Sequence, residues 1–330
     1  MNLQAARTID IHAHAVLEET LGAAREHGPE LTVAADGQPV FRVGNYRLHG
    51  VRYRGSAFMD VELRIAAMDR AGIDFQVLSP NPLTYFHFVD VPSAVDYCRR
   101  HNDVLSALVA RHPERLAGLA ALPMQSPADA ADELRRAVEL RGLWGAYVGT
   151  EFGIRLDAPE LDPLYRCCVA LDVPLFLHPA PAGIDGPAAF PPMDRFDLDL
   201  LVGFAAQETL AVATLIFGGV LDRHPALRVC ISHGGGAIGF LLGRFTDAAR
   251  KRPWSKGDMR EPGAFESRLR RLWYDNHVHS AASATLLENI VGRDRLVLGT
   301  NFAGWDQPAS DKPLAAAAGL ADNARTLLRK

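Results

Sequence analysis

Cysteine is scarce in this chain of 330 residues, and its few thiols show no functional spacing. None is separated from another by the short intervals typical of zinc ligands, so the cysteines do not form a metal site. They fall in apolar segments, which predicts buried, reduced thiols in a cytoplasmic protein. The four positions are Cys98, Cys167, Cys168 and Cys230.

Long apolar runs and an excess of basic charge are also missing. No apolar run approaches the roughly 20 residues that cross a bilayer, and residues 1–8 lack the apolar centre of a signal peptide. The net charge of −4 gives no electrostatic case for nucleic acid or an anionic membrane as the main partner. Most basic residues are arginines, which suit carboxylate substrates, although genome composition is the preferred explanation for most of them.

The sequence does contain a regular alternation of short apolar runs and amphipathic helical patterns. Continuous apolar runs are typical of strands that are buried on both faces. The expected strands lie at residues 8–12, 75–79, 116–122, 143–149, 174–178, 227–233, 272–277 and 296–301, and the expected helices at 61–72, 92–112, 126–141, 160–172, 199–215, 236–250, 280–292 and 311–329. Eight such pairs predict a (β/α)8 TIM barrel, an α/β fold, as a single domain over residues 1–330.

Three segments interrupt the alternation. Residues 31–53 combine turn residues with short alternating runs, which predicts a small β-hairpin inserted after the first strand. Residues 180–197, rich in proline and glycine, and residues 251–262 are expected to be loops. Long loops that follow the strands of a barrel usually form its substrate pocket.

Histidines stand at the ends of the predicted strands, where the active sites of barrels lie. The first strand ends in His12-Ala13-His14, and both imidazoles face one side because side chains alternate along a strand. The fifth strand ends at His178. Three neutral imidazoles with an open coordination position suit a catalytic divalent ion, with zinc preferred and manganese as the alternative. The competing interpretation is a set of hydrogen-bonded core histidines.

Two other strand ends carry further histidines. His233 precedes three glycines that let the backbone turn sharply, and we interpret it as an acid, a base or a transition-state donor. His277 and His279 follow the seventh strand. They either line the pocket, where His277 would contact the substrate, or form hydrogen bonds to loops.

Taken in order, these motifs resemble the amidohydrolase superfamily, in particular its branch of aminocarboxymuconate-semialdehyde decarboxylase and related non-oxidative decarboxylases. The resemblance covers almost the whole chain and implies a metal-dependent enzyme. The motifs are Ile-Asp-Ile-His-Ala-His at 9–14, the segment 64–79, Leu-Phe-Leu-His-Pro at 175–179, Glu-Thr at 208–209, Ile-Ser-His-Gly-Gly-Gly at 231–236, Phe-Leu-Leu-Gly-Arg at 240–244 and Arg-Leu-Val-Leu-Gly-Thr at 295–300.

Site roles follow from this resemblance by matching position. It implies four histidines at the site: the metal ligands His12, His14 and His178, and the catalytic His233. It also implies that Arg52, with Arg54 as the neighbouring alternative, and Arg244 bind carboxylates of a small-molecule substrate. In the decarboxylase the arginine that matches Arg244 reaches into the neighbouring subunit, which implies a functional homodimer.

One position departs from the family pattern. The family has an aspartate after the eighth strand, usually followed by Tyr-Pro, whereas this chain has Asn301, Phe302 and Ala303. An amide oxygen still coordinates a metal, weakly and without charge, but it cannot act as a general base. We therefore place Asn301 at the metal and catalytic site and expect it to disfavour ordinary hydrolysis. Asp306 could substitute only if its loop folds back.

Three functions are compatible with these residues. The first is a metal-dependent non-oxidative decarboxylase, a C–C lyase, acting on a small carboxylated aromatic or unsaturated acid. The second is a metal-dependent hydrolase or hydratase of a lactone, cyclic amide or enol acid, and it would depend strongly on the residue at position 301. The third is a ligand-binding barrel whose metal site is degraded at Asn301.

Overall fold

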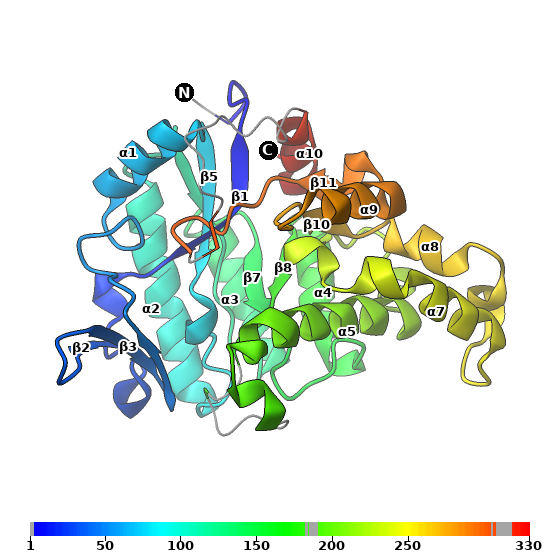
Figure 1. Cartoon of the computed structure of the whole chain (residues 1–330), viewed down its shortest axis with the longest axis horizontal. Helices are drawn as coiled ribbons and strands as arrows, with labels where there is room; N and C mark the ends of the chain where they lie inside the picture. Colours follow the sequence, from blue (N-terminus) through cyan, green and yellow to red (C-terminus); the bar gives the residue numbers. More distant parts are fainter. Residues whose placement is uncertain (1–2, 182–183, 185–190, 305, 308–318) are drawn as a thin grey trace.

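Parallel strands form the centre of the computed structural model (Figure 1), which describes residues 3–181, 184, 191–304, 306–307 and 319–330. Within these residues the parallel strands are β1 (Ile9–Ala15), β5 (Phe75–Pro80), β6 (Leu116–Gly118), β7 (Ala146–Gly149), β8 (Leu175–His178), β9 (Val229–Ile231), β10 (Trp273–Asp275) and β11 (Leu296–Val297). Each of them overlaps one of the eight predicted runs.

The strands follow one another in circular order. One sheet has the order β1-β5-β6 and a second has the order β11-β10-β9-β8-β7. Isolated parallel bridges join the two sheets at both junctions, where Asp10 pairs with Leu298 and Ala120 pairs with Ala146. This circular order confirms the predicted (β/α)8 fold class.

The barrel interior is filled with apolar side chains. One cluster takes a residue from every one of these strands, which requires that all of them surround a common centre: Ile9, Phe75, Ala117, Tyr147, Phe176, Cys230, Trp273 and Val297. The neighbouring residues Leu78, Val148 and Leu177 belong to another cluster, shared with the surrounding helices. Because alternate residues enter two different cores, the strands appear in the sequence as continuous apolar runs.

Helices surround the strands (Figure 1). Those that match predicted segments are α1 (Val61–Ala71), α2 (Val91–Val109), α3 (Pro127–Glu139), α4 (Asp162–Ala170), α5 (Phe204–Phe217), α7 (Ile238–Lys251), α9 (Ala281–Val291) and α10 (Leu320–Leu328). The start of the last predicted helix, residues 311–318, lies outside the described residues. The short helices α6 (Val220–Arg223) and α8 (Ala264–Leu269) were not predicted, because so few residues show no helical period.

The insertion after β1 is a small antiparallel sheet. Its strands β2 (Glu30–Val33), β3 (Pro39–Val43) and β4 (Tyr46–His49) pair in the order β2-β3-β4. The predicted hairpin is therefore in the right place but has a third strand. Phe41 and Val43 bury this sheet in a core that also contains Tyr97 of α2. Of the predicted loops, residues 182–183 and 185–190 lie outside the described residues.

One helical segment corrects the statement about apolar runs. A π-helical turn, η6 (Asp199–Gly203), continues directly into α5. The combined segment Asp199–Phe217 is long and apolar enough to cross a membrane by length and composition alone. Gln207 and Glu208 interrupt the run in the sequence, so its full length is not visible as one apolar stretch. A single helix of this kind also occurs in protein cores, and Glu208 is completely buried here.

Candidate active site

Three imidazoles meet at the carboxyl ends of β1 and β8. Ring nitrogens of His12, His14 and His178 all lie within 4.8 Å of one another, and all three side chains are buried. The Nε2 atoms of His12 and His14 are 3.2 Å apart. The structure thus brings together the three residues that their strand-end positions singled out.

Each of these imidazoles has an oxygen partner at Nδ1. The partners are Asp275 Oδ2 at 2.8 Å from His12, the Pro80 carbonyl oxygen at 3.0 Å from His14, and the Pro179 carbonyl oxygen at 2.6 Å from His178. Because these oxygens accept, each Nδ1 carries the proton and each Nε2 keeps a lone pair. Burial lowers the pKa of all three, that of His14 to about 3. Neutral imidazoles with outer oxygen partners are suited to metal binding.

A chain of buried polar groups fixes the first strand behind the histidines. Asp10 accepts hydrogen bonds from Gln76 Nε2 at 2.8 Å and from Thr300 Oγ1 at 2.7 Å. Arg64 donates to Gln76 Oε1 at 2.7 Å and to the backbone carbonyl of His14 at 2.6 Å. Burial raises the pKa of Asp10 to about 6, against the effect of its hydrogen bonds. Helix α1 and strands β1 and β5 are thereby locked together at the base of the site.

His233 is joined to a buried carboxylate. Its Nδ1 lies 2.6 Å from Oε1 of Glu208, which also accepts a hydrogen bond from Ser232 Oγ at 2.5 Å. The His233 ring centroid is 5.0 Å from that of His12 and 4.9 Å from that of His178. Burial opposes protonation of His233, but the Glu208 carboxylate outweighs it and raises the pKa of His233 to about 9. At neutral pH this imidazole is therefore a proton donor.

The turn after β9 explains how a residue of α5 reaches His233. His233 has a φ of 44°, and the three glycines that follow also have positive φ. A Cβ atom at Gly236 would overlap the backbone carbonyl of Ala205. The close approach that these glycines allow is therefore made to α5 itself, and Glu208 lies one helical turn beyond Ala205.

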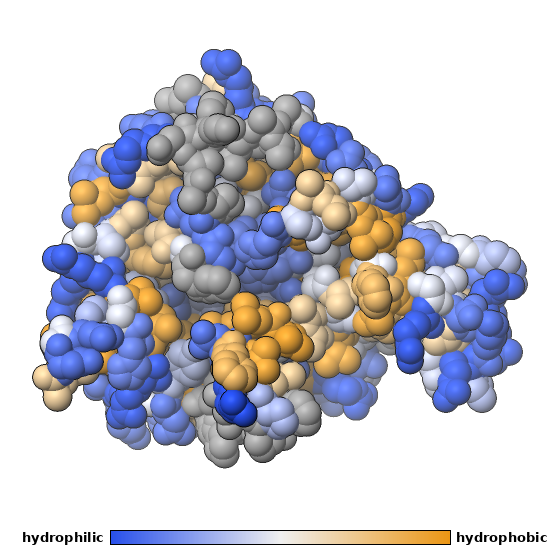
Figure 2. Space-filling model, viewed as in Figure 1, coloured by the Kyte–Doolittle hydropathy of each residue, from blue (hydrophilic) through white to orange (hydrophobic). Residues whose placement is uncertain are grey.

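A cavity of about 700 Å³ opens over these groups. It lies on the face shown in Figure 2. The hollow there has hydrophilic residues inside it and apolar residues along its edge. Its lining combines the apolar Leu200, Leu201, Phe204 and Val278 with the polar Glu208, His233, His277, His279, Asn301 and Asp306. Among the described residues no lysine or arginine lines it. Arg52 and Arg244 are exposed, and the structure does not bring them to this cavity.

The loop after β11 folds back toward the cavity. Asn301 and Ala303 adopt φ values of 45° and 64°. Asp306 accepts a hydrogen bond from Asn301 Nδ2 at 2.6 Å and lies 3.0 Å from Nε2 of His277. Burial opposes its ionisation, but the contacts with His277 and Asn301 lower the pKa of Asp306 to about 2. The loop therefore folds back and places the Asp306 carboxylate beside Asn301. His277 lines the cavity.

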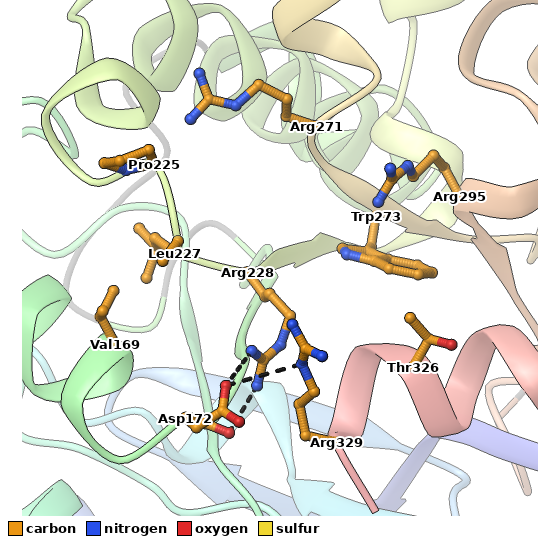
Figure 3. Close-up of a pocket in the computed structure, with 11 residues that line it drawn as sticks. Val169, Asp172, Pro225, Leu227, Arg228, Arg271, Trp273, Arg295, Thr326 and Arg329 are labelled. Atoms are coloured by element: carbon orange, nitrogen blue, oxygen red, sulfur yellow. Dashed lines mark hydrogen bonds and ion pairs between the residues drawn. The ribbon is translucent and has the colours of Figure 1, made fainter.

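A second cavity, of about 330 Å³, lies at the opposite ends of the strands (Figure 3). Arginines dominate it, but they bond to acceptors of the chain itself: Arg228 contacts Asp172 at 2.5 Å and donates to the Leu327 carbonyl at 2.8 Å. These bonds attach α10 to the base of the barrel. Polar groups at this end of such a barrel serve stability, so the chemistry belongs to the cavity at the carboxyl ends.

Several site residues were given no role from the sequence. Asp275 is the last residue of β10, and its carboxylate contacts His12. Its position at a strand end is the sequence signal that identifies it. Glu208 comes from a helix, where strand-end reasoning does not apply. The hydroxyls of Tyr85 and Tyr147 are buried without a hydrogen-bond partner in the described part of the chain. The Tyr147 ring centroid lies 5.6 Å from that of His14.

Comparison with known proteins identifies the family of this chain. The model of the family described as Amidohydrolase matches residues 9–329. The 2-amino-3-carboxymuconate-6-semialdehyde decarboxylase of Dictyostelium discoideum is 34% identical over 245 residues, which are 74% of this chain and 66%, just under two thirds, of that relative.

Two solved structures share the fold over 100% of this chain. One is the apo form of Metarhizium anisopliae IDCase, with a TM-score of 0.81, 23% identity and 98% of its own chain covered. The other is a dihydroxybenzoic acid decarboxylase from Polaromonas with bound manganese and 2-nitroresorcinol, with a TM-score of 0.73, 22% identity and 97% of its own chain covered. Because the family match spans nearly the whole sequence, this chain belongs to the amidohydrolase family.

Proposed function

We propose that this protein is a metal-dependent, non-oxidative decarboxylase of a small carboxylated aromatic or unsaturated acid. The observation that carries this proposal is that a cluster of three neutral imidazoles lies directly beside His233, an imidazole that Glu208 keeps protonated. Decarboxylation needs a Lewis acid and a proton donor at one place. Two of the similar proteins are named as decarboxylases of acids of this kind, which supports the same reaction class.

The three histidines fit a metal ion, since their lone pairs converge and their Nδ1 atoms are occupied. We propose that His12, His14 and His178 bind one divalent ion, with the amide oxygen of Asn301 as a further ligand. The donor set favours zinc, and the Polaromonas structure with its manganese makes that ion the alternative. When bound, the ion supplies Lewis acidity that draws electron density from an oxygen of the substrate.

The chain's own residues supply the proton. Glu208 occupies Nδ1 of His233, so Nε2 is the nitrogen left for the substrate. This N–H donates its proton to the carbon that bears the carboxylate. Electrons of the substrate's double bond or ring form the new C–H bond. The bond from that carbon to the carboxylate then breaks, its electron pair restores the double bond or ring, and CO₂ leaves. A solvent proton restores the imidazolium, which the Glu208 carboxylate stabilises. Phe204 and the neighbouring leucines exclude water from the reacting carbon.

We further propose that the functional unit is a homodimer. Phe240 of α7 is 87% exposed, and Arg244 follows on the same helix face one turn later. Other exposed apolar side chains lie on η6, α5 and α9: Leu201, Val202, Leu210 and Leu286. Figure 2 shows apolar side chains gathered beside the hollow on this face. A second copy covering this face would bring its Arg244 toward the cavity, whose described lining contains no arginine.

Isotope labelling tests the proposed proton transfer. With the metal-loaded protein in D₂O and a panel of hydroxybenzoates and carboxymuconates, we expect a product that has lost CO₂ and carries one deuterium at the former carboxyl carbon. His233→Asn should abolish this product. A product without CO₂ loss would overturn the proposal.

Hydration or hydrolysis is a second candidate, and the folded-back Asp306 favours it. This carboxylate lies beside Asn301 and lines the cavity, so it could serve as the base that position 301 lacks. The same incubation separates the two candidates, because a hydratase or hydrolase adds water to its substrate and releases no CO₂. Asp306→Asn would then abolish the addition of water.

A further inference from the structure

A second group of metal-binding side chains lies at the rim of the cavity. Ring nitrogens of His277 and His279 and a carboxylate oxygen of Asp306 all lie within 4.8 Å of one another. We infer that these three residues form a second cation site, separate from the three-histidine cluster, for a divalent ion of zinc-like preference. Two imidazoles and one carboxylate form a donor set that such ions accept.

The distances suit a single ion. Oδ2 of Asp306 is 3.0 Å from Nε2 of His277 and 3.5 Å from Nε2 of His279. Ligands bound tetrahedrally at zinc distances lie about 3.4 Å from one another. The three donor atoms therefore need to move little to coordinate an ion. His277 is buried, whereas His279 is 61% exposed, so an ion can enter the site from solvent.

Asn301 fits this second site as well as the first. Its Nδ2 donates to Oδ1 of Asp306 at 2.6 Å, which fixes the carboxylate and leaves Oδ2 directed at the two histidines. An aspartate at position 301 could not donate this bond and would place a second negative charge against Asp306. The departure from the family pattern at position 301 is thus accounted for by a contact of this chain.

An ion in this second site would also supply a positive charge to the cavity. Among the described residues no arginine or lysine lines it, although a carboxylated substrate needs a positive partner. An ion bound by His277, His279 and Asp306 would place that charge at the rim, where the His277 ring centroid lies 5.6 Å from that of His233. This role as a carboxylate anchor rests on the proposed function, whereas the binding of the ion does not.

Metal stoichiometry tests the inference without any substrate. Protein stripped by a chelator is titrated with Zn²⁺ by calorimetry, and the bound zinc is counted after gel filtration. We expect two ions per chain for the native protein, one for His279→Ala, and two for His49→Ala, which removes an exposed histidine of β4. His178→Ala should keep the rim ion and lose the other.

Two results would overturn the inference. One is a single zinc ion per native chain, and the other is two ions per chain in folded His279→Ala, with folding checked by circular dichroism. The anchoring role has its own readout, since His279→Ala should raise KM for a carboxylated substrate more than it lowers kcat; an unchanged KM would refute that role. The count of bound zinc ions needs no turnover, so a failed decarboxylase assay would not refute the second cation site. A count of one ion, in turn, would not refute the decarboxylase function.

Discussion

The contact between Glu208 and His233 is the single-residue feature on which the proposed chemistry most depends. Glu208→Gln keeps the size of the side chain but removes the charge that stabilises the imidazolium. We expect kcat to fall about 10²- to 10⁴-fold, the usual contribution of a positioned proton donor. The metal content should stay at the native value, because Glu208 forms no hydrogen bond with the three histidines that we propose as metal ligands. Steady-state kinetics and elemental analysis measure both quantities.

A matched control uses another buried glutamate. Glu133 of α3 is equally buried but bonds to Asn102 and Arg136, far along the chain from the site residues. Glu133→Gln should lower stability while leaving kcat near the native value. If Glu208→Gln were as active as the native protein, the assignment of His233 as a proton donor supported by Glu208 would be wrong.

Asp10 carries a structural prediction at the same scale. Its two oxygens accept hydrogen bonds from Gln76, from Thr300 and from the backbone of His12. Asp10→Asn places an amide donor against groups that are themselves donors. We expect the free energy of unfolding in urea to drop by about 1–3 kcal/mol, the cost of buried groups left without partners. Asp36→Asn, in an exposed turn, should change it by less than about 0.5 kcal/mol.

At the scale of elements, helix α2 contains a buried titratable group outside the site. Burial lowers the pKa of His101 to about 4, against an ordinary value of 6.5. The unfolded chain binds a proton below pH 6.5 and the folded chain does not until about pH 4. Stability is therefore complete above pH 6.5 and declines as the pH falls through this window. Between pH 7.5 and 5, His101 accounts for a loss of about 2 kcal/mol.

Substitution of His101 isolates this contribution. The free energy of unfolding of His101→Gln should fall less between pH 7.5 and 5 than that of the native protein, by about 2 kcal/mol. Urea unfolding at the two pH values measures the difference. An identical pH dependence in the two proteins would show that His101 titrates normally in the folded state.

The elements that the sequence predicted well are those with a strong periodic signal. The strands are buried on both faces, so each apolar run stood out. The third strand of the insertion and the short helices α6 and α8 have too few residues for a period to be visible. The continuity of η6 with α5 was hidden because Glu208, a residue of the site, lies in its apolar run.

At the scale of the whole molecule, the sequence predicted the site as far as strand ends could define it. His12, His14 and His178 converge because the carboxyl ends of parallel strands meet at one end of a barrel. Contacts made by loops and helices were beyond this reasoning. The return of Asp306 to Asn301 and the approach of Glu208 to His233 depend on backbone turns with positive φ, whose direction no local pattern specifies.

The proposed dimer gives a prediction for the whole assembly. If Arg244 acts in the partner's cavity, Arg244→Ala and His178→Ala should each be nearly inactive alone. Mixed dimers contain one site that has both residues, so mixing the two variants with exchange of subunits should restore about a quarter of the native activity. Assay after mixing measures the recovery, and light scattering reports the mass. Activity that does not rise on mixing would exclude a role for Arg244 across the interface.

Release of CO₂ is the measurement that bears most directly on the central claim. The native protein, stripped of metal and then reloaded with Zn²⁺ or Mn²⁺, is incubated with the hydroxybenzoate and carboxymuconate panel while evolved CO₂ is trapped. We expect at least one acid to lose CO₂ with the reloaded protein, and none with the stripped protein or with reloaded His233→Asn. Absence of CO₂ from every acid, or equal release with and without metal, would contradict the assignment as a metal-dependent decarboxylase.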